Sequence, residues 1–104
     1  MMDQNDVATF TNAVTQKLYQ ILVVQAKRMN FDEVQSNILA NQIVPPWNER
    51  IQAKLASSTT TKATAAMSEI KLGPAAYKVP SQSQKFSKLS EMAKSCLEAY
   101  FAKL

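Results

Sequence analysis

Hydrophobic residues recur at helical spacing over most of the first thirty positions. They lie three or four residues apart, or multiples of these, and they are Val7, Phe10, Val14, Leu18, Ile21 and Met29. Side chains at this spacing share one face of an α-helix, so the pattern predicts a helix from about Val7 to Met29, with Asp6 as its N-cap. The turn over residues 21–24 is apolar on every side. We expect this turn to lie either in the centre of the core or at a subunit interface.

A second, shorter helix is predicted to begin at Asn30. Asn30 and Glu33 form a variant of the capping box, in which the two side chains satisfy free backbone N–H groups. The inward positions of this helix are Val34 and Ile38, with Leu39 and Ile43 as further candidates. The helix should end at residues 45–46, both proline, because the residue before a proline is pushed out of the α region.

A third helix should follow the two prolines, since Pro46 suits the first turn of a helix. Trp47, Ile51 and Leu55 recur at a spacing of four and form its apolar stripe. Trp47 could anchor a partner, because tryptophan is enriched in interface hot spots. We favour the alternative that it fills the core where the second and third helices meet.

The polar run at residues 57–61 favours a turn and separates the third helix from a fourth. Thr60 or Thr61 should cap that fourth helix, whose inward residues are Ala63, Ala66 or Met67, and Ile70. Gly73 is predicted to end it in the left-handed conformation, and a proline follows. Residues 74–80 read as an extended connector that places Tyr77 and Val79 against the core.

The last helix should begin at Ser81, which forms a Ser-x-x-Gln capping box with Gln84. It is expected to run to residue 104. Its apolar stripe consists of Phe86, Leu89, Ala93, Cys96 or Leu97, Tyr100 and Leu104.

The scarcity of glycine indicates the fold class. The chain has 104 residues and one Gly, whereas the average content is about 7%. Sheet proteins use glycine in tight hairpin turns that need a positive φ. We therefore predict an all-α protein: a single domain over residues 1–104, built as an irregular bundle of four to five helices with long first and last helices.

Composition also argues against several classes of function. The chain has no histidine and one cysteine, Cys96, so the commonest general base is missing and no intramolecular disulfide can form. We expect no catalytic residues, no metal site and no cofactor, and a buried, inert Cys96. The lone cysteine favours a reducing compartment, the cytoplasm. No apolar run approaches the roughly 20 residues of a membrane-spanning helix, and the first residues resemble no secretory signal.

The charge is unevenly distributed along the chain. Residues 1–50 hold four basic and five acidic side chains, a balance of −1, and residues 51–104 hold eight lysines and three glutamates, a balance of +5. A basic segment of this kind either keeps the protein soluble or attracts acidic partners and nucleic acid. The candidate contacts to such partners are Lys54, Thr61, Lys62, Thr64, Lys85 and Lys88.

Residues 52–73 carry a pattern that bears on nucleic acid. Gln52, Leu55 and Ala56 are followed by a turn of small residues and by a second apolar-periodic segment that ends near Gly73. This pattern resembles the helix-turn-helix of phage-type repressors, with a threonine in place of the turn glycine and one extra residue in the turn. The resemblance implies that the first residues of the second helix would face base edges in the major groove.

Apolar residues in excess of one helical stripe predict a protein interface. They gather in the first helix and at the end of the last one, and the candidates are Tyr19, Leu22, Val23, Tyr100, Phe101 and Leu104. Small domains rarely leave large apolar patches in water, and self-association as a homodimer would cover them. We therefore predict a non-enzymatic binding protein, such as an adaptor, modulator or chaperone-like protein. The alternative is a small DNA-binding regulator.

Overall fold

Helices make up the whole regular structure of the described chain. The computed structural model describes residues 1–73 and 81–104. Within these ranges it has five α-helices and two short 3₁₀ helices: α1 (Gln4–Arg28), α2 (Glu33–Ile43), η1 (Pro45–Trp47), α3 (Asn48–Ala56), α4 (Thr60–Ala66), η2 (Met67–Glu69) and α5 (Gln82–Lys103). The predicted all-α bundle with long first and last helices is confirmed. Tyr77 and Val79, which we expected against the core, lie outside the described residues.

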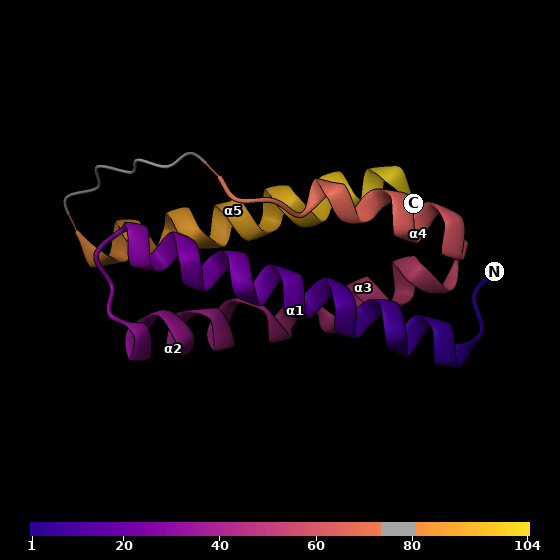
Figure 1. Cartoon of the computed structure of the whole chain (residues 1–104), viewed down its shortest axis with the longest axis horizontal. Helices are drawn as coiled ribbons and strands as arrows, with labels where there is room; N and C mark the ends of the chain where they lie inside the picture. The colour runs from indigo at the N-terminus through magenta and orange to yellow at the C-terminus, as the bar shows by residue number, and fades with distance from the viewer. Residues whose placement is uncertain (74–80) are drawn as a thin grey trace.

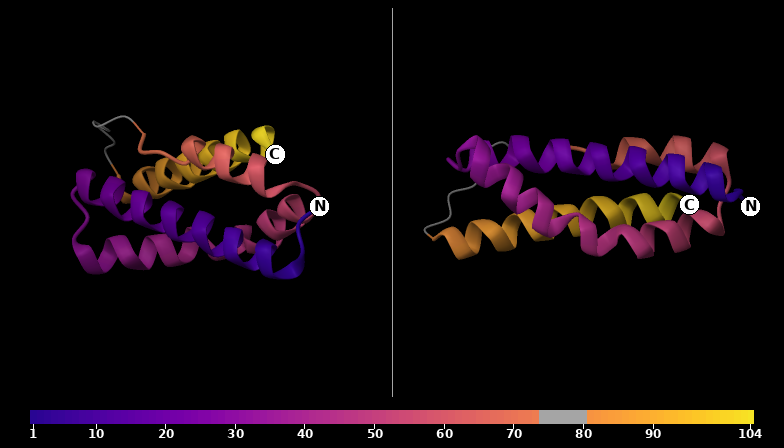
Figure 2. Two further views of the ribbon diagram at one scale, coloured as in Figure 1. Left: turned by 45° about the vertical axis from the view of Figure 1, so that its right-hand side comes forward. Right: turned by 90° about the horizontal axis from the view of Figure 1, so that it is seen from below.

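The helices form an elongated bundle, with extents of 45 × 21 × 16 Å. The two long helices α1 and α5 run in opposite directions along the long axis (Figure 1). After α1 the chain turns back, and α2, η1 and α3 together return along its length. The short helix α4 packs against the carboxyl-terminal half of α5, as two further views also show (Figure 2). None of the described helices is long and apolar enough to cross a membrane.

Both early N-caps differ from the prediction. Asp3 Oδ1 accepts a hydrogen bond from the Asp6 backbone N–H at 2.8 Å, so α1 begins three residues before the expected Val7. Likewise, Asp32 Oδ1 accepts from the Gln35 N–H at 2.7 Å, and Asp32 rather than Asn30 caps α2. In each place two good N-cap residues lie within three positions of one another, and side-chain type alone does not rank them.

Asn30 instead ends α1. Its φ of 71° is left-handed, a conformation that asparagine tolerates better than most residues. The Asn30 N–H donates to the Lys27 carbonyl at 3.0 Å, and the Phe31 N–H donates to the Ala26 carbonyl at 3.1 Å. This pair of bonds is the Schellman motif, which satisfies carbonyls at a helix end. The sharp reversal between α1 and α2 follows from it.

The prediction that Gly73 ends the fourth helix in the left-handed conformation is wrong. Helix α4 ends at Ala66 and continues only as the 3₁₀ turn Met67–Glu69, so no helix reaches Gly73, and its φ is not positive.

At the start of α4, Thr59 Oγ1 accepts from the Lys62 N–H at 3.3 Å, which makes Thr59 the cap in place of Thr60 or Thr61. The predicted Ser81 cap of α5 is confirmed: its hydroxyl accepts from the Gln84 N–H at 3.3 Å.

The predicted core faces are confirmed for α3, for most of α5 and for Ile43 of α2, and wrong for the first half of α2. Ile51, Leu55 and Leu97 are completely buried. On α2, however, Val34 and Ile38 are 68% and 51% exposed. The face of α2 that meets α1 is made by Ser36, Ala40 and Ile43, and the two small residues let the helix backbones approach closely. Phe86, also predicted inward, is 36% exposed near the start of α5.

Candidate functional site

A cluster of aromatic and basic side chains lies where α3 passes the end of α5. The two prolines of η1 hold a single 3₁₀ turn, in which the Trp47 N–H donates to the Val44 carbonyl at 3.0 Å. Arg50 and Lys54 follow Trp47 by three and seven residues, so the three side chains share one face of this helical segment. The fourth member, Phe101, comes from the last turn of α5.

The two rings are in contact and cations lie over them. The Trp47 and Phe101 centroids are 6.5 Å apart at an interplanar angle of 46°. The Arg50 guanidinium carbon lies 5.4 Å from each of the two centroids, and the Lys54 ammonium lies 5.9 Å from that of Phe101. These distances are within the range of cation–π attraction. We call Trp47, Arg50, Lys54 and Phe101 the aromatic–basic face.

The rings are partly buried while the cations are exposed. Trp47 and Phe101 pack against the core, which fixes their position, and Arg50 and Lys54 reach solvent. Within the described ranges, the ion pairs are Lys27–Glu33, Lys88–Glu91 and Lys94–Glu98. Arg50 and Lys54 belong to none of them. The face therefore carries two positive charges that no described carboxylate neutralises.

A cavity of about 360 Å³ lies directly beside this face. Ile43, Pro46 and Trp47 line one wall, and Phe86 and Ser90 of α5 line the other. Gln42 of α2 and two charged residues of α5, Glu91 and Lys94, complete the lining. Each of the two charged residues is already paired with another α5 residue, at 3.5 Å and 3.8 Å. The cavity is therefore an apolar hollow with balanced charge at its edge, and the uncompensated charge lies on Arg50 and Lys54.

The structure brings together members of two separate sets of sequence candidates. Lys54 came from the basic set and Phe101 from the apolar set, and they meet on one surface. Leu22 and Tyr100, by contrast, are 1% and 0% exposed. These two predictions are corrected: the side chains fill the chain's own core and offer nothing to a partner.

The remaining interface candidates are half-buried, and Tyr19 and Val23, both on α1, lie outside the face. Tyr19 packs beside α2, where its hydroxyl hydrogen bonds to Asn37 Oδ1 at 2.8 Å. Val23 packs one turn further along α1. Leu104 lies against the core, and its carbonyl accepts from the buried Ser58 hydroxyl at 3.3 Å. The predicted apolar residues thus do not form one continuous patch.

The predicted nucleic-acid contacts are divided between the two ends of the bundle. Thr61, Lys62 and Thr64 are exposed on α4, whereas Lys85 and Lys88 lie in the first turns of α5 at the opposite end (Figure 1). The Lys85 ammonium lies 5.5 Å from the Phe31 ring centroid. Helices α3 and α4 are consecutive and joined by residues 57–59, as a helix-turn-helix requires, although α4 has only seven residues. The six residues do not make one surface.

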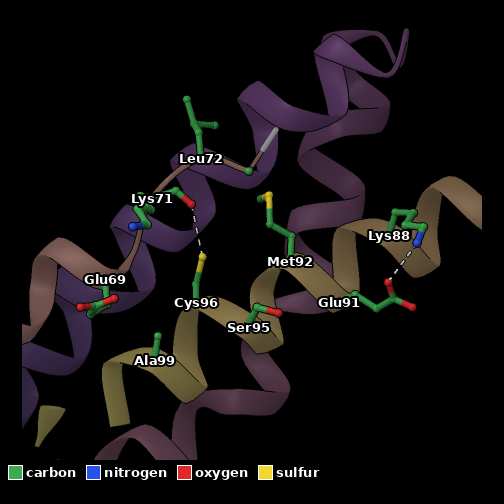
Figure 3. Close-up of a pocket in the computed structure, with 10 residues that line it drawn as sticks. Glu69, Lys71, Leu72, Lys88, Glu91, Met92, Ser95, Cys96 and Ala99 are labelled. Atoms are coloured by element: carbon green, nitrogen blue, oxygen red, sulfur yellow. Dashed lines mark hydrogen bonds and ion pairs between the residues drawn. The ribbon is translucent and has the colours of Figure 1, made fainter. Parts of the chain in front are cut away.

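A second cavity, of about 340 Å³, surrounds Cys96 (Figure 3). The Cys96 thiol donates to the Lys71 carbonyl at 3.3 Å and so ties the segment after η2 to α5. Lys88 and Glu91, on the same helix as Cys96, form an ion pair at 3.5 Å at the edge of this cavity (Figure 3). The cysteine is 7% exposed, and its hydrogen bond gives it a structural role. In the described part of the chain, no group of three or more Cys, Asp or Glu side chains could hold a metal ion.

Sequence reasoning missed Arg50, and for Trp47 it favoured a place in the core over the role of partner anchor. A signal was present, since the spacing of Trp47, Arg50 and Lys54 puts an aromatic ring and two cations on one helical face. The partner ring is 54 positions away in sequence, and only the tertiary fold brings it near.

Comparison of the chain with models of protein families, with curated proteins and with solved structures finds no match.

Proposed function

We propose that this protein is a non-enzymatic adaptor or modulator that holds another protein through its aromatic–basic face. The observation that carries the proposal is the contact of Trp47 and Phe101 beneath the uncompensated Arg50 and Lys54. Tryptophan and arginine are the residues most enriched in interface hot spots. Because the rings pack on the core, few rotamers are lost when a partner binds, which favours affinity. We place this activity in the cytoplasm, on the ground that the chain has one free cysteine.

The proposal is tested by capturing partners from the source cell with the immobilised full chain. Three versions are compared: wild type, Arg50→Glu with Phe101→Ala, and Lys71→Glu as the charge control. Lys71→Glu makes the same reversal of charge in the segment after η2, away from the face. We expect the face variant to lose a partner that wild type and Lys71→Glu both retain. Equal capture by all three, with melting temperatures showing that each is folded, would refute a binding role for this face.

Self-association is proposed for a different surface, the outer side of α2. Val34 and Ile38 are exposed there, within residues 34–48, which contain no charged side chain. A charge-free face meets no like charge in a two-fold copy of itself, so it is suited to a homodimer. Light scattering of wild type and of Val34→Glu with Ile38→Glu tests this proposal. It predicts a dimer that the double variant separates, and a wild-type monomer at the same concentration would contradict it.

A DNA-binding regulator remains the second candidate function, and one observation favours it. Thr61, Lys62 and Thr64 are all exposed at the start of the second of two consecutive helices, where recognition residues of a helix-turn-helix lie. This candidate predicts binding to duplex DNA that weakens steeply as salt is raised and that Lys62→Ala reduces further. Binding to duplex DNA that is weak and insensitive to both changes would remove it.

A further inference from the structure

We propose that the natural partner of the aromatic–basic face is an acidic peptide segment that inserts one bulky apolar side chain into the cavity between Trp47 and Phe86. This inference rests on the protein-binding function proposed above and names the chemistry of the partner. It assigns the carboxylates of that partner to Arg50 and Lys54. It assigns the apolar anchor to the 360 Å³ hollow beside them.

The negative charge expected of the partner follows from which charged side chains of this protein already form ion pairs. Glu91 and Glu98, the acids of α5 nearest to this surface, form ion pairs with Lys88 and Lys94 on the same helix. Glu49 of α3 lines a different cavity, beside the start of α1. Arg50 and Lys54 form no ion pair with a described carboxylate, and both lie over the Phe101 ring. A guanidinium in a fixed position favours a carboxylate, which it can bind with two parallel hydrogen bonds.

The anchor follows from the shape and lining of the cavity. Its volume is that of a small ligand pocket, and apolar side chains from α2, η1 and α5 form most of its wall. Phe86 leaves 36% of its surface in solvent, and covering this ring removes apolar area from water at roughly 25 cal/mol per Å². A leucine or an aromatic side chain of the partner fits the cavity and also covers the Phe86 ring.

The length of the partner segment follows from the spacing of residues on α5. Phe86, Ser90 and Lys94 recur every four residues and lead toward Phe101. At 1.5 Å per residue, Phe86 and Phe101 are about 22 Å apart along the helix axis. An extended segment of about seven residues spans this distance, and so does a helix of about fifteen. The anchor binds at the Phe86 end and the carboxylates at the Phe101 end.

The rings and the neighbouring acids disfavour a single-stranded nucleic acid as the occupant. Base stacking needs an open aromatic face, but Arg50 lies over Trp47, and both Arg50 and Lys54 lie over Phe101. Glu91 at the edge of the cavity would face the phosphates. A second copy packed face to face is disfavoured as well, because its Arg50 and Lys54 would meet their own counterparts.

The probe that tests this inference is a random library of peptides about sixteen residues long, displayed on phage and selected against the full folded chain, so that a helical as well as an extended segment spans the site. The wild-type pool should be enriched in Asp and Glu together with one Leu, Phe or Trp. Peptides from this pool should bind Arg50→Glu with Lys54→Glu at least tenfold more weakly. They should bind Lys71→Glu, whose exposed side chain lies outside the face and outside the cavity beside it, as well as wild type. Raising the salt concentration from 50 to 500 mM should weaken their binding severalfold, since surface charges are screened.

A second variant tests the cavity without changing any charge. Ser90→Trp places an indole in the hollow from the half-buried Ser90 position and should weaken the selected peptides about tenfold, at an unchanged melting temperature. Two results would overturn the inference: a pool with no acidic enrichment, or peptides that bind both variants as well as wild type. Displacement of the peptides by a thymidine oligonucleotide at lower concentration than by free peptide would also overturn it, in favour of nucleic acid.

The two proposals can fail separately. Selected peptides that are neutral or basic but still lose binding in Phe101→Ala would refute the acidic partner and leave the protein-binding face in place. Peptides and captured partners that still bind when Trp47, Arg50 and Phe101 are substituted would refute both the acidic partner and the protein-binding face.

Discussion

Two neighbouring aromatic residues at the end of α5 have opposite surroundings. Tyr100 is 0% exposed and points toward α4, with its hydroxyl 3.5 Å from the Ala63 carbonyl. Phe101 points toward α3, where it is partly buried and has two cations over its ring. Tyr100 therefore belongs to the core, and Phe101 lies at its border. An apolar residue is open to a partner only where the fold leaves part of it in solvent.

The largest expected difference between the two sides is in stability. Tyr100→Ala removes a completely buried ring and should lower the free energy of unfolding by about 3–5 kcal/mol. Phe101→Ala removes a partly buried ring and two cation–π contacts and should lower it by about 1–2 kcal/mol. Urea denaturation of both variants measures the two values. Equal losses would contradict the assignment of Tyr100 to the core and Phe101 to the surface.

The next effect concerns pH. Burial raises the pKa of Tyr100 from the ordinary value of 10.0 to about 12. Below pH 10 the phenol is protonated in both states, so its burial carries no ionisation penalty. Between pH 10 and pH 12 only the unfolded chain loses this proton, and the free energy of unfolding should fall by about 1.4 kcal/mol per pH unit.

The control for this effect is Tyr100→Phe, which keeps the buried ring and has no proton to lose. Subtracting its pH profile from that of wild type removes the contribution of lysines that titrate in the same range. Parallel profiles for the two proteins between pH 10 and pH 12 would show that the Tyr100 phenol is solvated.

A smaller effect is expected from removing the cation that lies over both rings. Arg50→Ala deletes two exposed cation–π contacts and should lower the free energy of unfolding by about 1 kcal/mol. Lys103→Ala, on the same basic half of the chain, should change it by less than about 0.5 kcal/mol. Thermal melts followed by circular dichroism make the comparison. Identical melting temperatures for the two variants would show that Arg50 does not rest on the rings.

The smallest effect on the free energy of unfolding is expected on the outer face of α2. At a concentration at which the protein is monomeric, Ile38→Gln alters a side chain that is 51% exposed and should change the free energy of unfolding by less than about 0.5 kcal/mol. Ala40→Gln, two positions later, forces a larger side chain between α1 and α2 and should lower it by about 1–3 kcal/mol. Denaturation of the two variants separates the outer face of α2 from the inner one, and the reverse order of losses would restore the sequence-based assignment.

The sequence predicted the fold class and several helix boundaries because local chemistry determines them. A single glycine, the apolar stripes of α3 and α5, and the Ser81 hydroxyl all act through nearby residues. The inner face of α2 was not predictable from hydrophobicity. Ser36 and Ala40 face α1 because small side chains permit close packing, and the larger Val34 remains outside. Which residues of α2 face inward therefore depends on the helix that it packs against and not on the sequence of α2 itself.

The candidate site was only partly predictable for a similar reason. Lys54 and Phe101 were both identified as surface candidates, one by charge and one by apolar excess. Their contact depends on α3 and α5 passing one another, and the sequence pattern of neither helix specifies that crossing. Tyr100 and Phe101 could not be separated by pattern either, because adjacent positions near the end of a helix both border its apolar stripe.

The central claim is that Arg50 and Lys54 bind carboxylates of a partner beside the Trp47 ring. A charge-swap measurement tests it most directly. The tightest selected peptide and its copy with every acidic residue replaced by lysine are titrated into wild type and into Arg50→Glu with Lys54→Glu. We predict that each protein binds the peptide of opposite charge at least tenfold more tightly than the other peptide. If both proteins prefer the same peptide, the claim is contradicted.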